Sequence, residues 1–297
     1  MTLYHYCSNS TFCSIINSKS IWLSSMSLSN DTMEGKWLRE IMIGKLRTAS
    51  VSPATFQAAI EKFDLMLEIS DRLGFCLSEK DDLLSQWRGY AEDGAGVSIG
   101  FAKDFLQDKS PSGEGLPGWS LHKVTYDMVG PESKLSNVVS DLLDASARGV
   151  FDTRIDDEPS NFTGDSNYQA ELLTKIVNML SKVAPEIASL KITGLFPEIF
   201  TIKNPAFIEE HEWRLLSNLL YRDNHDDDDN QEKCSYRAGQ KGIVPYRVYT
   251  LPFGEKTVIE QVVLGPKNTS KLQDVEKFLR LAGLKDVEVK RSEATYR

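Results

Sequence analysis

Short runs in which apolar and polar residues alternate recur along most of the chain, and each run predicts a β-strand. They lie at 3–7, 21–25, 74–78, 96–101, 122–127, 212–220, 234–238, 243–251, 257–265 and 286–292. The residues GQKG at 239–242 separate two of these runs and predict a hairpin there. We therefore expect a sheet-rich α+β fold.

Apolar residues at helical spacing predict helices between the strands. These segments are about 11–20, 37–46, 53–67, 81–91 and 269–283, and Ser8 or Ser10 is expected to cap the first. Two further amphipathic segments, around 132–149 and 168–192, flank a polar loop. We interpret residues from about 131 to 195 as a helical insertion or lid. No long linker interrupts the chain, so we expect a single α+β domain over 1–297.

Composition narrows the class of protein. The 297 residues carry a formal net charge of −9, which argues against wrapping nucleic acid with a broadly basic surface. Cys7, Cys13, Cys76 and Cys234 form no CxxC pair and predict no zinc site, and Cys7 and Cys76 lie in apolar stretches typical of buried residues. The acidic run at 226–229 lacks EF-hand spacing and predicts a solvated loop. No metal cofactor is expected.

Targeting signals are the next property to consider. The chain begins MTLYHYCS, without the charged and apolar regions of a signal peptide. No apolar run approaches the roughly 20 residues that span a bilayer. We therefore expect a cytoplasmic protein with no membrane partner.

One short stretch, residues 74–101, concentrates side chains that a core element would not require: Ser78, Gln86, Trp87, Arg88, Tyr90, Asp93, Gly94 and Gly96. On the predicted helix, Trp87 shares an apolar face with Tyr90 or Ala91, whereas Arg88 does not fit a core. The glycines predict close approach of another backbone or of a ligand phosphate. Their spacing matches neither a Walker loop nor a dinucleotide-binding motif.

A second stretch, EEHEWR at 209–214, places charges on a predicted strand. Glu210, Glu212 and Arg214 lie two residues apart, so on a strand they face the same side. Such a row is either a surface salt-bridge ladder or a functional carboxylate that Arg214 orients.

Two N-terminal groups also have both a structural and a functional interpretation. His5 is either a satisfied histidine at a sheet edge or a rigid anchor for a ribose hydroxyl. Asn30, Asp31 and Glu34 precede a predicted helix. A capping box explains Asp31 and Glu34, and a binding role is the alternative.

Taken in order, the motifs resemble a widespread bacterial family of unknown function. They are LYHY at 3–6, IWLS at 21–24, ND at 30–31, the FCLS…SQWRGYA…GAGVSIGF block ending at 101, FxxExEWR at 207–214, PYR at 245–247 and VVLGP at 262–266. This resemblance covers nearly the whole chain outside 131–195. The same order is similar to the His-Tyr-Glu branch of the ADP-ribosyltransferase fold, whose members include toxins that modify DNA.

The second resemblance implies a mixed, mainly antiparallel sheet core of ADP-ribosyltransferase-like type, with NAD as substrate and no metal. His5 would hold the ribose of NAD. Glu212, or Glu210 as the other candidate, would stabilise the positive charge that develops as the bond between ribose and nicotinamide breaks. The resemblance does not say whether the acceptor of the ADP-ribose group is a protein, a nucleic acid or water.

The same resemblance implies a set of nucleotide contacts. Tyr90 or Trp87 would form an aromatic wall against nicotinamide, although here both lie on a predicted helix rather than a strand. Arg88 or Arg214 would pair with the pyrophosphate. The other binding residues that it implies are Tyr6, Ser24, Asn30, Asp31 and Ser78.

Three hypotheses about function follow. The first is an NAD-consuming enzyme, an ADP-ribosyltransferase or NAD glycohydrolase, of the kind found in toxins and phage-defence effectors. The second is a non-catalytic module of a defence system that senses a nucleotide or binds a protein. The third is a metal-dependent nucleic-acid enzyme, which would need carboxylates that converge on a metal ion.

Overall fold

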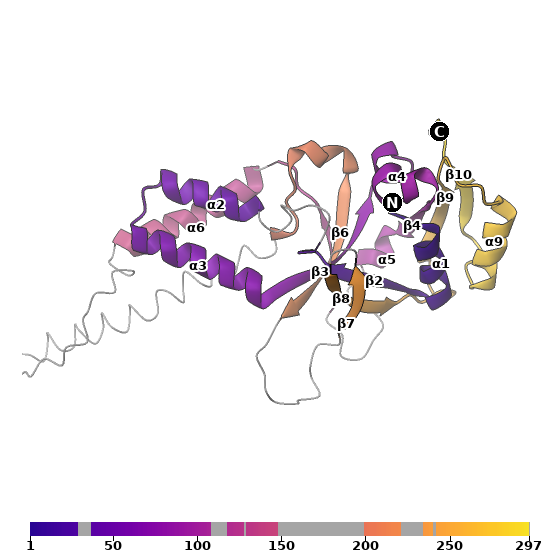
Figure 1. Ribbon diagram of the computed structural model, residues 1–297, viewed down its shortest axis with the longest axis horizontal. Coiled ribbons are helices and arrows are strands. Elements are labelled where there is room, and N and C mark those ends of the chain that lie inside the picture. The colour runs from indigo at the N-terminus through magenta and orange to yellow at the C-terminus, as the bar shows by residue number, and fades with distance from the viewer. Residues whose placement is uncertain are drawn as a thin grey trace, which may run out of the picture. The chain divides into compact units, whose positions relative to one another are not determined.

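The computed structural model describes residues 1–28, 37–107, 118–127, 129–147, 199–220, 234–239 and 242–296 (Figure 1). The chain divides into two compact units. The first, here called the sheet unit, comprises 1–32, 70–126 and 203–297. The second, the helical unit, comprises 33–69 and 127–202.

The described part of the sheet unit contains one ten-stranded sheet. Its strands are β1 (Thr2–Cys7), β2 (Ser20–Ser25), β3 (Ser70–Ser78), β4 (Val97–Ala102), β5 (Ser120–Lys123), β6 (Glu212–Leu220), β7 (Ser235–Gly239), β8 (Gly242–Thr250), β9 (Ile259–Leu264) and β10 (Glu288–Arg291). The strand order is β10-β9-β4-β1-β3-β2-β8-β7, and β6 pairs with both β3 and β5. Only β10 and β9 run parallel among the named strands. The predicted α+β class with a mainly antiparallel sheet is therefore confirmed.

The two faces of this sheet pack against different helices. One face, here the α1 face, carries Leu3 and Cys7 and packs on α1 (Asn9–Ser18) and α9 (Leu272–Leu281). The other, the α4 face, carries Tyr6, whose ring meets that of Trp87 on α4 (Leu84–Tyr90) with centroids 4.8 Å apart. Since successive side chains of a strand point to opposite faces, neighbouring residues of β1 belong to different environments.

Short elements complete the sheet unit. They are α5 (Lys103–Gln107), which was not predicted, and two 3-10 helices, η1 (Glu92–Gly94) and η2 (Pro205–Glu210). The expected capping of α1 is confirmed, because the Ser8 hydroxyl accepts a hydrogen bond from the backbone N–H of Thr11 at 3.0 Å. The expected hairpin is also confirmed, since β7 pairs antiparallel with β8.

The glycine-rich turn after α4 packs against backbone. A Cβ atom added to Gly96 would lie 2.2 Å from the carbonyl oxygen of Cys7, and one added to Gly265 would lie 2.3 Å from that of Gly94. Only glycine permits so close an approach of two chain segments. Of the two predicted uses of these glycines, the structure therefore supports close backbone contact.

The described part of the helical unit contains α2 (Trp37–Thr48), α3 (Pro53–Ile69) and α6 (Val129–Ala147). Its buried residues include Met42, Phe63 and Leu135. Helix α6 corresponds to the start of the predicted insertion, but the segment expected at 168–192 lies outside the described residues. None of the described helices is long and apolar enough to cross a membrane.

One burial prediction is wrong. Cys7 is buried as expected, but Cys76 is exposed although it lies on β3, inside the sheet. Its register partner on β6 is Arg214, so the thiol belongs to the α4 face. The apolar neighbours of Cys76 in sequence point to the α1 face, and they made its surroundings look like a core.

Candidate functional site

Four charged side chains converge on the α4 face of the sheet unit: Lys203, Glu210, Glu212 and Arg214, here called the charge quartet. The Nζ of Lys203 lies 2.6 Å from Oε2 of Glu210 and 3.1 Å from Oε2 of Glu212. Arg214 donates to both oxygens of Glu212, from Nε at 2.8 Å and from Nη2 at 2.9 Å. All four residues are buried, so water screens these charges weakly.

Two different backbone devices bring the carboxylates together. Glu212 begins β6 and pairs with Ser78 of β3, and Arg214 pairs with Cys76. Glu210, in contrast, ends η2 and does not belong to the strand. Between the carboxylates His211 adopts the left-handed conformation, with φ 45° and ψ 48°, which costs free energy for a residue with a Cβ.

The expected convergence of Glu210 and Glu212 is therefore present, but strand alternation is not its cause. The left-handed turn at His211 directs Glu210 back toward Lys203. Strained backbone of this kind is enriched at functional sites, where the surrounding structure holds it in place.

The two carboxylates have opposite pKa shifts. Burial alone would raise the pKa of Glu212, but the charges and hydrogen bonds of Arg214, together with Lys203, outweigh burial and hold the pKa at about 2. Burial raises the pKa of Glu210 above its ordinary value, even though Lys203 acts in the opposite direction. Burial would lower the pKa of Lys203, but both carboxylates raise it, so the ammonium stays charged.

Two tyrosines and one cysteine adjoin the quartet. The backbone N–H of Glu212 donates to the hydroxyl of Tyr126 at 3.0 Å. Burial and the charge of Glu210 raise the pKa of Tyr90 to about 12, although its side chain is still 45% exposed. The thiol of Cys76 hydrogen-bonds the Glu212 side chain. Since both Tyr90 and Cys76 are exposed, the sheet face beside the quartet is accessible to solvent.

The structure thus brings together five of the predicted site residues: Glu210, Glu212, Arg214, Tyr90 and Ser78. The hydroxyl of Ser78 donates to the carbonyl oxygen of Glu210 at 2.7 Å, so it supports the turn that orients this carboxylate. The predicted function of these residues stays a prediction.

Lys203 and Tyr126 were missed in the sequence. Lys203 is the only charge in the stretch IFTIKNPAF at 199–207, and a lone lysine among apolar residues was the available signal. Tyr126 lies in a predicted strand and offered no comparable signal.

His5 is not part of this group. Its ring stacks on Phe75 of the α1 face at 4.0 Å between centroids, and its Nδ1 donates to the carbonyl oxygen of Cys76 at 2.8 Å. Burial lowers its pKa to about 4, so the imidazole is neutral at pH 7. His5 and Glu212, which the resemblance assigns to the same nucleotide, point to opposite faces of the sheet, because Tyr4 and not His5 is in register with Ser78, and Ser78 with Glu212.

The other predicted aromatic residues of the site differ in exposure. Trp87 is fully buried between Tyr6 and Ala91, and its Nε1 donates to Asp82 at 2.6 Å. Tyr6 belongs to the same packing, because its hydroxyl donates to the carbonyl oxygen of Lys80 at 2.8 Å. Ala91, and not Tyr90, therefore shares the apolar face of α4 with Trp87. Tyr90 is the aromatic residue of α4 that a ligand can reach.

The predicted cationic and small polar contacts lie elsewhere or are already engaged. Arg214 is bound to Glu212 and is no simple pyrophosphate ligand. Arg88 lies over the ring of Tyr296 at 5.9 Å. Ser24 accepts a hydrogen bond from Arg237 at 3.3 Å. Asn30 and Asp31 lie outside the described residues.

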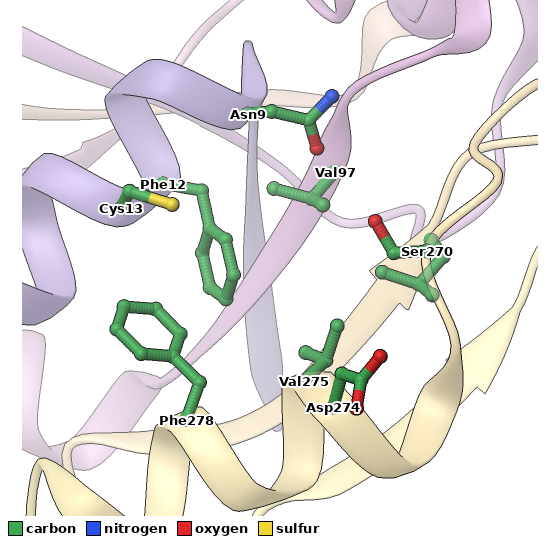
Figure 2. A pocket seen from close by; sticks show the side chains of 9 residues that line it. Asn9, Phe12, Cys13, Val97, Ser270, Asp274, Val275 and Phe278 are labelled. Atoms are coloured by element: carbon green, nitrogen blue, oxygen red, sulfur yellow. The ribbon is translucent and has the colours of Figure 1, made fainter.

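A crevice of about 300 Å³ opens between α1 and α9 (Figure 2). Val97 and Leu264 form part of its wall, and Asn9, Cys13, Ser270 and Asp274 line it with polar groups. Val97 pairs with Cys7 across β1 and β4, so the crevice lies on the α1 face. It is therefore separate from the charge quartet.

Comparison with known proteins finds one family model that is similar to part of the chain. Residues 86–215 match the model of a family described as "Protein of unknown function (DUF2971)". The match supports the expected resemblance to a family of unknown function. It covers α4 from Gln86 onward and the whole charge quartet, but less than half of the chain. No curated protein and no solved structure matches the sequence.

In the described ranges, no three or more histidine, cysteine, aspartate or glutamate side chains lie together as metal ligands would. The acidic run at 226–229 lies outside those ranges.

Proposed function

We propose that this protein breaks the bond between ribose and nicotinamide in NAD at the charge quartet, as an ADP-ribosyltransferase or an NAD glycohydrolase. The observation that carries the proposal is the pair of buried carboxylates, Glu210 and Glu212, with opposite pKa shifts around one lysine. Two carboxyl groups whose environments separate their pKa values are typical of acid–base and glycosyl-transfer sites.

Glu212 supplies negative charge in the proposed reaction. Its low pKa keeps it ionised, and Arg214 fixes the carboxylate at the start of β6. Departure of nicotinamide leaves positive charge on the ribose, and a fixed carboxylate stabilises that charge more than it stabilises neutral ground-state ribose.

Glu210 handles the proton of the acceptor. Its pKa lies above that of an ordinary carboxyl group, so Glu210 is a better base than Glu212 for a hydroxyl acceptor or for water. Lys203 holds this carboxylate at 2.6 Å in the free protein. The proton leaves the acceptor as its oxygen bonds to the ribose carbon, and nicotinamide takes the electrons of the broken bond.

The exposed side chains beside the quartet define where NAD enters. Tyr90 offers a partly exposed ring for the planar nicotinamide. Because Arg214 is already paired with Glu212, we assign the pyrophosphate to Arg88, whose guanidinium lies over the ring of Tyr296 and near the charge of Asp93. His5 has no role in this scheme.

The test is release of nicotinamide from NAD by the purified protein. Glu212→Gln abolishes release, whereas Glu209→Gln, at the exposed neighbouring position, leaves it unchanged. Because Glu212→Gln removes a buried charge from an ion-pair network, its circular dichroism and unfolding midpoint must be recorded with the activity. Nicotinamide release that is unchanged in a folded Glu212→Gln variant contradicts the proposal.

The mutual neutralisation of the quartet favours one second candidate, a non-catalytic nucleotide-binding module. Two cations and two carboxylates that pair with one another suit a stable platform that binds a ligand without reacting with it. This candidate predicts that NAD raises the unfolding temperature without any release of nicotinamide.

A further inference from the structure

Helix α4 lies between two aspartates that both bind the C-terminal segment. Asp82 precedes the helix and Asp93 follows it. Residues 292–296 reach both of them, although they are about 200 positions later in the sequence. This segment is here called the C-terminal clasp.

Asp82 is the first point of attachment. One of its oxygens accepts from the hydroxyl of Ser292 at 2.6 Å, and the other accepts from the backbone N–H groups of Glu293 at 2.7 Å and Ala294 at 3.2 Å. The same carboxylate accepts from the indole of Trp87 at 2.6 Å. One side chain therefore joins the clasp to the buried face of α4.

Asp93 is the second point of attachment. It accepts from the hydroxyl of Tyr296 at 2.7 Å and pairs with Lys267 at 2.8 Å. The ammonium of Lys267 also lies 4.1 Å from the centroid of the Tyr296 ring. Asp93 has the left-handed φ of 53°, so these contacts hold a residue in a conformation that it does not favour by itself.

Helix α4 depends on such external contacts. It has only seven residues, and no side chain caps its N-terminus. A helix of this length is not stable alone in water. We infer that the C-terminal clasp fixes α4 and thereby positions Tyr90, the last residue of this helix, beside the charge quartet. That the clasp fixes α4 is independent of the proposed function. The effect of the position of Tyr90 on NAD turnover rests on the proposed function.

The experiment compares two double variants of the full chain by hydrogen exchange and mass spectrometry. Ser292→Ala with Tyr296→Phe removes one hydroxyl donor at each attachment point and changes no residue of α4. Ser235→Ala with Tyr236→Phe makes the same chemical changes on the exposed strand β7. The clasp variant is expected to exchange the amides of residues 87–91 about tenfold faster, with α9 unchanged.

The control variant is expected to match the wild type at 87–91. Exchange of those amides within about twofold of the wild type in the clasp variant would overturn the inference. Hydrogen exchange needs no turnover of NAD, so it tests whether the clasp fixes α4 even where the proposed function fails. Where NAD is turned over, the KM for NAD rises about fivefold with a smaller change in kcat, and an unchanged KM would overturn the positioning of Tyr90.

Discussion

The two faces of the sheet unit are built from the same strands but have opposite chemistry. On the α1 face, the half-buried His5 stacks on Phe75 of the apolar core and is neutral. On the α4 face, the carboxylate of Glu212 and the guanidinium of Arg214 are buried. The difference shows that two residues of one sheet need not share a site, because alternate side chains of a strand belong to different faces.

The largest effect that tests this comparison is loss of Arg214, one of the quartet's two cations. Arg214→Met leaves Glu212 buried with fewer partners, so the free energy of unfolding should fall by about 3–5 kcal/mol in urea denaturation. Arg237→Met, at an exposed arginine of β7, should cost less than about 0.5 kcal/mol. Equal stability of the two variants would contradict the buried, interdependent quartet.

The next effect belongs to the α1 face and depends on pH. The unfolded chain binds a proton at His5 near pH 6.5, but the folded chain binds it only near pH 4. Protonation therefore favours unfolding, so stability is retained above pH 6.5 and is lost as the pH falls toward 4, by up to about 3 kcal/mol.

His5→Phe keeps a ring against Phe75 and removes this titration. Urea midpoints measured at pH 7 and pH 4.5 should therefore differ less in His5→Phe than in the wild type. The same pH dependence in both proteins would contradict a neutral His5 on the α1 face.

A smaller effect sharpens the role of the α4 face. Tyr90→Ala removes a partly exposed ring, so the KM for NAD should rise about tenfold, as expected for loss of one aromatic contact of about 1–1.5 kcal/mol. Tyr236→Ala, on β7, removes a more exposed ring and should leave KM unchanged. Steady-state rates of nicotinamide release give both values, and equal KM values would remove Tyr90 from the site.

Much of the fold followed from local patterns. The start of β6 at Glu212, the cap at Ser8 and the hairpin of β7 and β8 were predicted, because alternation and turn residues act over a few positions. The strand order and the division into two units were not, since they depend on contacts between distant segments.

The candidate site was only partly predictable for the same reason. The EEHEWR motif located Glu212 and Arg214. The left-handed turn that directs Glu210 toward Lys203 could not be predicted, because histidine and not glycine stands at position 211. His5 was assigned by its place on the first strand, and its face depends on the register with β3. The choice between Trp87 and Tyr90 as the accessible aromatic was left open by the sequence, because it depends on whether Tyr90 or Ala91 completes the buried face of α4.

The central claim is that the nucleotide binds on the α4 face beside the charge quartet, and two exposed thiols test it directly. Cys76 lies on that face, and Cys13 lines the crevice between α1 and α9. Alkylation by iodoacetamide is followed at each thiol by mass spectrometry, with and without NAD. With NAD at about ten times its Kd, the account predicts alkylation of Cys76 slowed about tenfold and Cys13 unaffected. An unchanged rate at Cys76, or protection of Cys13 alone, would contradict it.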